Sequence, residues 1–146
     1  MPSSEKEDGP SESFGIFEIY GGKIGIAPRV PVRFLEDFSI RYTPGVVAVS
    51  RKIQRDPDLS FEYTGRWYAV SVITDGSRVL GLGNIGPEGA LPVIEGKALI
   101  YNYLGGVGAI PLPVKAEDEE DLISIVKALE PSSGSSSTQC VASGGW

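Results

Sequence analysis

The sequence predicts an α/β domain in which short mixed strands are flanked by helices. Two observations indicate this class: residues 68–74 are rich in β-branched and aromatic side chains, and apolar residues recur at helical spacing on either side of them. The chain has 146 residues, 41% of them apolar, which suits one domain with a real core. It is too short for two full domains.

The N-terminal elements are expected to be short. Residues 1–12 carry too few apolar groups to offset the entropy of ordering, so we expect them to be disordered. Residues 14–20 are compatible with a short helix. Residues 23–27 follow a Gly-Gly break and alternate enough to form a short strand.

A longer helix is predicted from Thr43 to about Arg55. The Thr43 hydroxyl can cap free N–H groups, and Pro44 at the first helical position sacrifices no hydrogen bond. Pro57 ends the helix, because the residue before a proline avoids helical geometry. The expected buried stripe consists of Val46, Val49 and Ile53.

A β-hairpin is predicted next. Residues 68–74 form its first strand, Asp75-Gly76 is a preferred two-residue turn, and residues 78–82 return as the partner strand.

Four elements are predicted in the C-terminal half. Residues 92–104 suit a helix closed by two glycines, and residues 109–114 suit a strand whose two prolines confine it to a sheet edge. Residues 117–129 form an amphipathic helix, and its acidic first turn matches the positive end of the helix dipole. Residues 132–146 are rich in Ser and Gly, so we expect a flexible tail.

Composition excludes several classes of function. A formal net charge of −6 argues against nucleic acid or anionic membrane surfaces as partners. The chain has no histidine, which removes Ser-His and Cys-His nucleophile pairs and His-containing metal sites. A single cysteine, Cys140, cannot form an internal disulfide. No segment resembles a membrane span or an apolar signal region, so a cytoplasmic protein is expected.

Lys97 is the candidate general base. On a helix, its neighbours three and four residues away are all apolar, whereas Glu95 points elsewhere. A lysine desolvated in this way has a lowered pKa and can accept a proton near neutral pH. The alternative is a lysine whose stem covers apolar surface while its ammonium reaches water.

The run from Gly81 to Gly86 satisfies the dinucleotide pattern G-x-G-x-x-G. We interpret it otherwise, because Pro87 and Pro92 are expected to prevent a continuous helix after the glycines. In addition, no acidic residue lies about 20 positions further on to hold a ribose. No cofactor-binding residue is therefore predicted in this chain.

Three motifs occur in a fixed order: Tyr42-Thr43-Pro44-Gly45-Val46, Gly81-Leu82-Gly83-Asn84-Ile85-Gly86-Pro87 and Glu95-Gly96-Lys97-Ala98. This set resembles the amino-terminal domain of malic enzymes, especially the short bacterial and archaeal form, from about Val32 to Pro131. The resemblance implies a three-layer-like domain over residues 13–131, followed by a non-matching tail over residues 132–146.

The resemblance also implies catalytic roles. Lys97 matches the lysine that takes the proton from the C2 hydroxyl of malate, and Tyr42 matches the tyrosine that returns a proton to C3 after carbon dioxide leaves. A place before a helix N-terminus would favour the phenolate and so assist proton donation by Tyr42. The alternative for Tyr42 is a residue that packs at a helix entry.

The substrate-binding residues implied by the resemblance lie around the glycine loop. Arg78 matches an arginine that grips a malate carboxylate in two-pronged fashion, although a solvent-facing strand residue is an equal alternative. Gly83 lets backbone approach the small substrate, and Asn84 is a weaker candidate for the pocket wall.

The rest of the family pattern is missing. Agreement stops at Leu129-Glu130-Pro131-Ser132, before the acidic residues that hold Mg²⁺ or Mn²⁺ and before the domain that binds NAD or NADP. We therefore expect no metal or cofactor site in this chain and no activity from it alone. The resemblance implies malate and pyruvate as ligands and a homodimer in the intact protein. The alternatives are a non-catalytic dimerisation fragment, a malolactic enzyme, and a small nucleotide-binding protein that uses the glycine loop.

Overall fold

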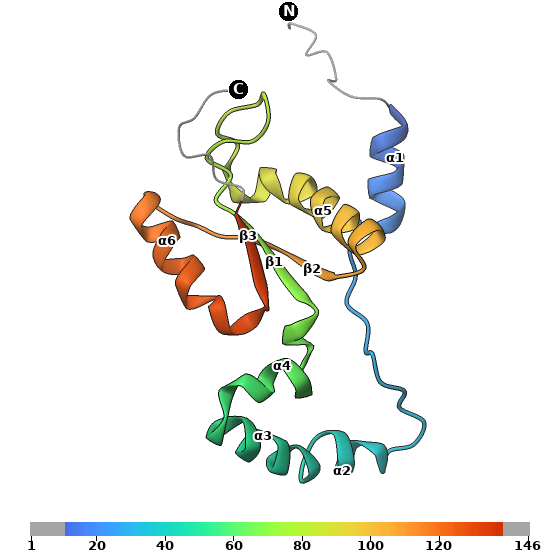
Figure 1. Ribbon diagram of the computed structural model, residues 1–146. Helices are drawn as coiled ribbons and strands as arrows, with labels where there is room; N and C mark the ends of the chain where they lie inside the picture. Colours follow the sequence, from blue (N-terminus) through green and yellow to red (C-terminus); the bar gives the residue numbers. More distant parts are fainter. Residues whose placement is uncertain (1–10, 139–146) are drawn as a thin grey trace, which may run out of the picture.

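The computed structural model describes residues 11–138. A three-stranded sheet lies at its centre, with helices on either side (Figure 1). The elements in chain order are α1 (Ser11–Tyr20), α2 (Asp37–Arg41), α3 (Gly45–Arg55), η1 (Pro57–Leu59), α4 (Ser60–Tyr63), η2 (Gly65–Trp67), β1 (Ala69–Thr74), α5 (Gly86–Gly105), β2 (Gly108–Pro113), α6 (Glu119–Ala128), η3 (Glu130–Ser132) and β3 (Ser135–Thr138). The predicted α/β class of short strands flanked by helices is confirmed.

The sheet has the strand order β2-β1-β3, and both pairings are parallel. The central strand β1 pairs with β2 from Ala69 opposite Gly108 onward, and with β3 from Val70 opposite Ser135 onward. The predicted hairpin is therefore wrong, and residues 78–82 form no strand. Both edges of β1 are occupied by strands from later in the chain, which leaves no edge for an antiparallel return. The strand predicted at the sheet edge is confirmed as β2.

The core lies between the sheet and α5. Its buried side chains come from β1, α5 and β2, and they are Val72, Ile94, Ala98 and Ala109. Helix α5 begins at Gly86, six residues before its predicted start, and contains Pro92 without interruption. It ends as predicted, because Gly106 adopts a left-handed conformation with a φ of 66° that lets its N–H reach the last turn.

The elements α2, α3, η1 and α4 form a helical arm, residues 37–63, which extends away from the sheet (Figure 1). Two segments join it to the body, which we define as residues 69–138: the irregular stretch 21–36 and the short turn η2. Helix α3 confirms the helix predicted for this region and ends at Arg55, but the expected stripe of Val46, Val49 and Ile53 is only half-buried, because the arm packs little against the rest of the chain. Thr43 does not cap it, because Pro44 occupies the cap position and no side chain bonds to the free N–H groups.

The N-terminal region is partly as predicted. The helix expected over residues 14–20 is confirmed within α1. Residues 23–27 form no strand. Instead, this segment is fastened to α5: the Lys23 N–H donates to Glu95 Oε2 at 3.0 Å, and Lys23 Nζ donates to the Pro92 carbonyl at 2.9 Å. The polar groups of Lys23 thus form their hydrogen bonds with α5, so this segment needs no neighbouring strand.

The C-terminal helix is confirmed as α6, and the Asp118 side chain caps it by accepting from the Asp121 N–H at 2.8 Å. The flexible tail expected from residue 132 is wrong for its described part, because residues 135–138 form β3. The buried Ser133 hydroxyl lies 2.9 Å from that of Ser71, and the Gly134 N–H donates to the Ala69 carbonyl at 3.1 Å. Backbone pairing with β1 thus orders a sequence with little apolar character. Cys140 and the remaining tail residues lie outside the described residues.

Candidate functional site

Lys97 lies in the middle of α5, next to the fully buried Ala98. Its side chain is half-buried, and the structure of residues 11–138 gives it no hydrogen bond or ion pair. Its neighbour Ile94 is buried, whereas Ile100 is 56% exposed. The apolar surroundings expected for this lysine are therefore present on the side toward the helix N-terminus. Glu95 faces another way, since its carboxylate accepts from the Lys23 backbone.

Tyr42 lies between α2 and α3. Its N–H donates to the Phe38 carbonyl at 2.8 Å, and its carbonyl accepts from the Val46 N–H at 2.6 Å. These backbone bonds join the two helices. Tyr42 lies two residues before Pro44, the cap of α3. The phenol ring is 69% exposed. It therefore lies close to a helix N-terminus, as predicted, and its ring is open to solvent.

The two proposed catalytic residues are far apart in the single chain. Tyr42 belongs to the arm, whereas Lys97 belongs to α5, which packs against β1 and β2 at the other end of the molecule from the arm (Figure 1). The main contacts of α3 are with α2 and η1, and those of α5 are with β1 and β2. One chain in this conformation does not bring the two side chains together.

The three predicted substrate-binding residues lie in the loop between β1 and α5, and all of them are exposed. Arg78 immediately precedes a tight turn in which the Val79 N–H donates to the Gly83 carbonyl at 2.9 Å. Gly83 has a φ of 76°, a left-handed conformation that L side chains adopt only with strain. The Asn84 side chain accepts from the Gly86 N–H at 3.2 Å, so it fixes the approach to α5.

The residues that follow the glycine run form a helix, which differs from our expectation. Gly86 does open a continuous helix despite Pro87 and Pro92, so this ground against a dinucleotide fingerprint is wrong. Pro87 lies at the start of the helix, where its missing N–H costs no intrahelical bond. The fingerprint also requires a strand just before the glycines, and residues 78–82 are irregular. The interpretation that this loop does not bind a dinucleotide stays a prediction.

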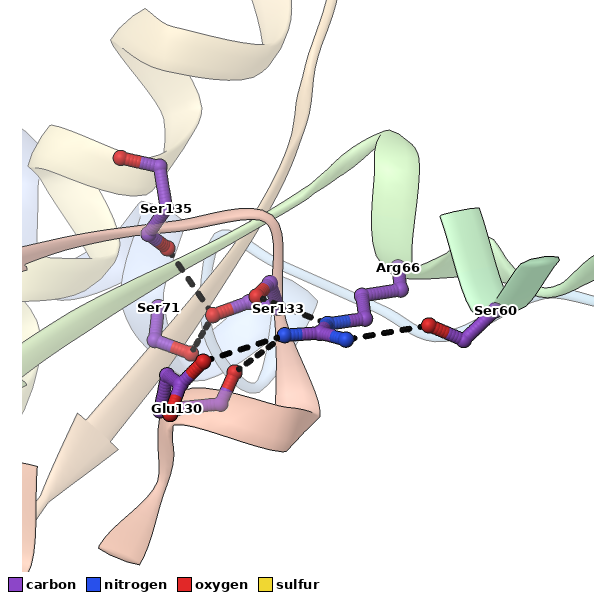
Figure 2. A network of polar contacts seen from close by, with 6 residues as sticks. All are labelled: Ser60, Arg66, Ser71, Glu130, Ser133 and Ser135. Atoms are coloured by element: carbon purple, nitrogen blue, oxygen red, sulfur yellow. Dashed lines mark hydrogen bonds and ion pairs between the residues drawn. The ribbon is translucent and has the colours of Figure 1, made fainter. Parts of the chain in front are cut away.

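Two features of the described chain escaped the sequence analysis. The backbone N–H groups of Arg33 and Phe34 donate to the Asp37 carboxylate and lower its pKa below the ordinary value of 3.8. The Arg66 side chain takes part in a polar network beside a cavity of about 410 Å³ (Figure 2). The partners of Arg66 include residues more than 60 positions away, so no local pattern could have indicated them.

Within residues 11–138, no group of three or more Cys, Asp or Glu side chains is placed to hold a metal ion. None of the described helices is long and apolar enough to cross a membrane.

Comparison with known proteins identifies the domain. Residues 23–127 match the family model "Malic enzyme, N-terminal domain". The bifunctional malic/malolactic enzyme of Bacillus subtilis (strain 168) is 41% identical over 123 residues, which is 84% of this chain and 30% of that protein. The NAD-dependent malic enzyme of Geobacillus stearothermophilus is 44% identical over 114 residues, which is 78% of this chain and 24% of that protein.

The fold agrees with these matches. The crystal structure of the NAD-dependent malic enzyme from Thermotoga maritima superposes with a TM-score of 0.83 at 45% identity, over 86% of this chain and 33% of that one. The malic enzyme from Pyrococcus horikoshii gives a TM-score of 0.81 at 45% identity, over 84% of this chain and 28% of that one. The chain spans less than a third of the length of these relatives. On the strength of the match over residues 23–127, it belongs to the malic enzyme family.

Proposed function

We propose that this chain is the substrate-side domain of an enzyme that converts malate and NAD or NADP to pyruvate and carbon dioxide. The proposal is supported by the family match over residues 23–127 and by relatives described as NAD-dependent or NADP-dependent malic enzymes. Lys97 is the observation that carries it: a half-buried lysine on α5, without a bonded partner in the described chain. The domain limits at residues 13 and 131 and a cytoplasmic location belong to the same proposal.

The chemistry assigned to this chain is proton transfer at two positions of the substrate, the C2 hydroxyl and C3. Lys97 removes the proton of the malate C2 hydroxyl, for which a lysine flanked by the apolar Ile94 is a suitable base. NAD or NADP, bound elsewhere, would accept the C2 hydride, and after carbon dioxide has left the oxidised substrate, Tyr42 delivers a proton to C3, which yields pyruvate. Tyr42 is 69% exposed, so a substrate can reach it.

The residues of this domain do not fit a metal ion, because the described part of the chain lacks a suitable ligand cluster. No step above is therefore assigned to a metal. We expect Mg²⁺ or Mn²⁺ and the nicotinamide cofactor to bind to a domain beyond this one, so the isolated chain should be inactive.

Malate would bind beside the loop between β1 and α5. The Arg78 guanidinium is exposed there and can grip a carboxylate with two parallel hydrogen bonds. Gly83 leaves the loop backbone open on one side, since no atom lies within 4 Å of the place a Cβ would take. Asn84 holds the loop against the start of α5 through its bond to Gly86.

We further propose that the intact protein is a homodimer. The arm and the stretch before it expose large apolar side chains, among them Phe34 at 70%, Leu35 at 82% and Ile40 at 74%. Exposed large apolar side chains that gather in one segment are typical of protein interfaces. Contact with a second copy would also provide a way to place a Tyr42 near a Lys97. The same exposure favours the second candidate function, a dimerisation module without catalysis.

A chimera tests the catalytic proposal. Residues 23–127 of this chain would replace the matching segment of the Geobacillus stearothermophilus relative, and malate-dependent NAD⁺ reduction would be measured. Lys97→Met should lower the rate about 10²–10⁴-fold, because the base acts before every later step. Its control is Lys115→Met, which removes an exposed lysine of the body and should leave the rate unchanged.

Tyr42→Phe should slow a different step in the same chimera. The loss should appear as slower exchange of the pyruvate methyl protons with solvent, by about 10²–10⁴-fold. Its control is Tyr103→Phe, which changes a tyrosine that is 83% exposed on α5. Small and equal effects of Lys97→Met and Tyr42→Phe would contradict catalytic roles and favour the dimerisation module.

A further inference from the structure

The arm reaches the body through a narrow joint. Its helices contact one another, and α4 contacts η2, which leads directly into β1. Figure 1 shows the arm extending from this point at the opposite end of the molecule from α5. The direction of the arm, and with it the position of Tyr42, therefore depends on how η2 is held.

Arg66 lies at the centre of η2 and bonds to both sides of the joint (Figure 2). Toward the arm, its Nη1 donates to the Ser60 hydroxyl at 3.0 Å, and its guanidinium lies 4.3 Å from the centre of the Phe61 ring. Toward the body, Nη2 donates to the Glu130 carbonyl at 3.4 Å and Nε to the Ser133 carbonyl at 3.5 Å. The side chain is only 18% exposed.

The body side of this network is itself anchored to the sheet. The Ser133 hydroxyl lies 2.9 Å from the Ser71 hydroxyl of β1 and donates to the Ser135 carbonyl of β3 at 2.9 Å. A Cβ on Gly134 would lie 2.8 Å from the Arg66 carbonyl, so the start of β3 packs directly against η2. Arg66 is thus connected through few bonds to the two neighbouring strands β1 and β3.

We propose that Arg66 is a positioning residue that sets the angle between the arm and the body, and thereby the place of Tyr42. This inference rests on the proposed function insofar as Tyr42 acts on the substrate. The planar guanidinium donates in several fixed directions at once, which a lysine ammonium on a flexible stem does not reproduce. A network that joins three segments through one such group fixes their relative orientation.

The geometry of the arm amplifies small changes at the joint. Helix α3 has 11 residues and is therefore about 16 Å long. A rotation of about 10° moves a group at the end of a lever of this length by roughly 3 Å. Displacement of a catalytic group by about 1 Å can already cost about 10²-fold in rate. Loss of the Arg66 contacts should therefore impair Tyr42 without any change in α5.

The first test measures the arm directly in the 146-residue chain. Spin labels on Ser50→Cys in α3 and Ile123→Cys in α6, both exposed positions, report their separation in a Cys140→Ser background. The distance distribution should be narrow with Arg66 and clearly broader in Arg66→Met. Arg55→Met removes an exposed arginine of the arm as a matched control and should leave the distribution unchanged. An unchanged distribution in Arg66→Met would overturn the proposal.

A milder pair of variants guards against loss of folding. Ser60→Ala removes the bond on the arm side but leaves the contacts of Arg66 with Glu130 and Ser133. It should broaden the distribution less than Arg66→Met. Arg66→Lys keeps the charge and should restore part of the narrow distance distribution. Equal distributions in Ser60→Ala and the parent chain, with an unfolded Arg66→Met, would count against the proposal.

The second test concerns the step that Tyr42 would perform. In a chimera extended to residues 23–138 of this chain, so that Glu130 and Ser133 are included, Arg66→Met should slow exchange of the pyruvate methyl protons at least about 10-fold, with a smaller change in the malate KM. Arg66→Lys should recover part of the rate, and Arg55→Met should have none of these effects. A change in malate KM alone would contradict a positioning role. If Tyr42→Phe has no effect on exchange, the proposed function fails, whereas the spin-label distances still decide the role of Arg66.

Discussion

At the scale of single residues, the positions of the functional candidates follow from the bonds of their neighbours. Lys97 has no bonded partner within residues 11–138, and the Glu95 carboxylate, two positions away, accepts from the Lys23 backbone. Asn84 is held by the start of α5, and Tyr42 by the backbone bonds that join α2 to α3. The environment of each of these residues therefore depends on the residues around it in space as well as on its own type.

Asp37 provides a prediction at this scale. Its carboxylate accepts from the N–H groups of Arg33 and Phe34, at 2.8 Å and 3.2 Å, which lowers its pKa below 3.8. A lowered pKa in the folded state means that the stabilisation is complete above pH 3.8 and is lost as the pH falls through the folded value. The carboxyl ¹³C resonance of Asp37 should therefore titrate with a midpoint below 3.8.

The variant Asp37→Asn tests the cause of this shift. An amide oxygen accepts the same two N–H groups without titrating, so the arm should lose the pH dependence that the carboxylate gives it below pH 3.8. Circular dichroism as a function of pH would compare the two chains. A midpoint of Asp37 at or above 3.8 would show that these bonds do not form in solution.

At the scale of elements, helices were easier to predict than strands. The helices α3 and α6 follow local apolar spacing and terminal residues, which the sequence displays directly. The strand β3 has no such signal: its residues are serines and a threonine, and it forms because β1 offers unpaired backbone groups beside it. The turn expected at Asp75-Gly76 has the right residues for a hairpin, yet β1 already has partners on both edges.

Helix α5 provides the prediction at this scale. Ile94 is 1% exposed and faces the sheet, so Ile94→Ala should lower the free energy of unfolding by about 2–5 kcal/mol. The same change at Ile100, which is 56% exposed on the same helix, should alter it by no more than about 0.5 kcal/mol. Urea denaturation measures both. Similar losses in the two variants would mean that both isoleucines are covered, as in a dimer that buries Ile100.

At the scale of the whole molecule, the separation of the arm from the body is the main feature. The arm carries Tyr42 and exposed apolar side chains, whereas the body carries Lys97 and the loop of Arg78 and Gly83. The family match covers both parts, and the chain spans less than a third of the relatives compared. The described chain therefore carries the two proposed catalytic residues on separate parts.

Cofactor binding tests this view of the whole chain. If the glycine loop borders a malate pocket, calorimetry should detect no micromolar binding of NAD⁺ to the isolated chain. In the chimera, Gly83→Val should raise the malate KM and leave the NAD⁺ KM nearly unchanged, because the side chain would enter open space above the loop. Gly81→Ala, at a position with neither positive φ nor close atoms, is its control. Micromolar NAD⁺ binding would instead favour the dinucleotide interpretation.

The sequence by itself determined the α/β class and the helices that follow a local apolar pattern. Through three ordered motifs it also determined the family. Residue types alone made Lys97 the candidate base, since a lysine among apolar neighbours is recognisable from helical spacing. The inferences about the helices and the family succeed because each pattern or motif spans only a few positions, whereas the role of Lys97 stays a prediction.

Only the tertiary structure decided the parallel pairing of β1 with two later strands, the ordering of residues 135–138 and the separation of Tyr42 from Lys97. It also brought Arg66 to Glu130 and Ser133. All four depend on backbone or side-chain hydrogen bonds between segments distant in sequence. Such bonds can satisfy a polar strand as well as an apolar one, so composition does not indicate them.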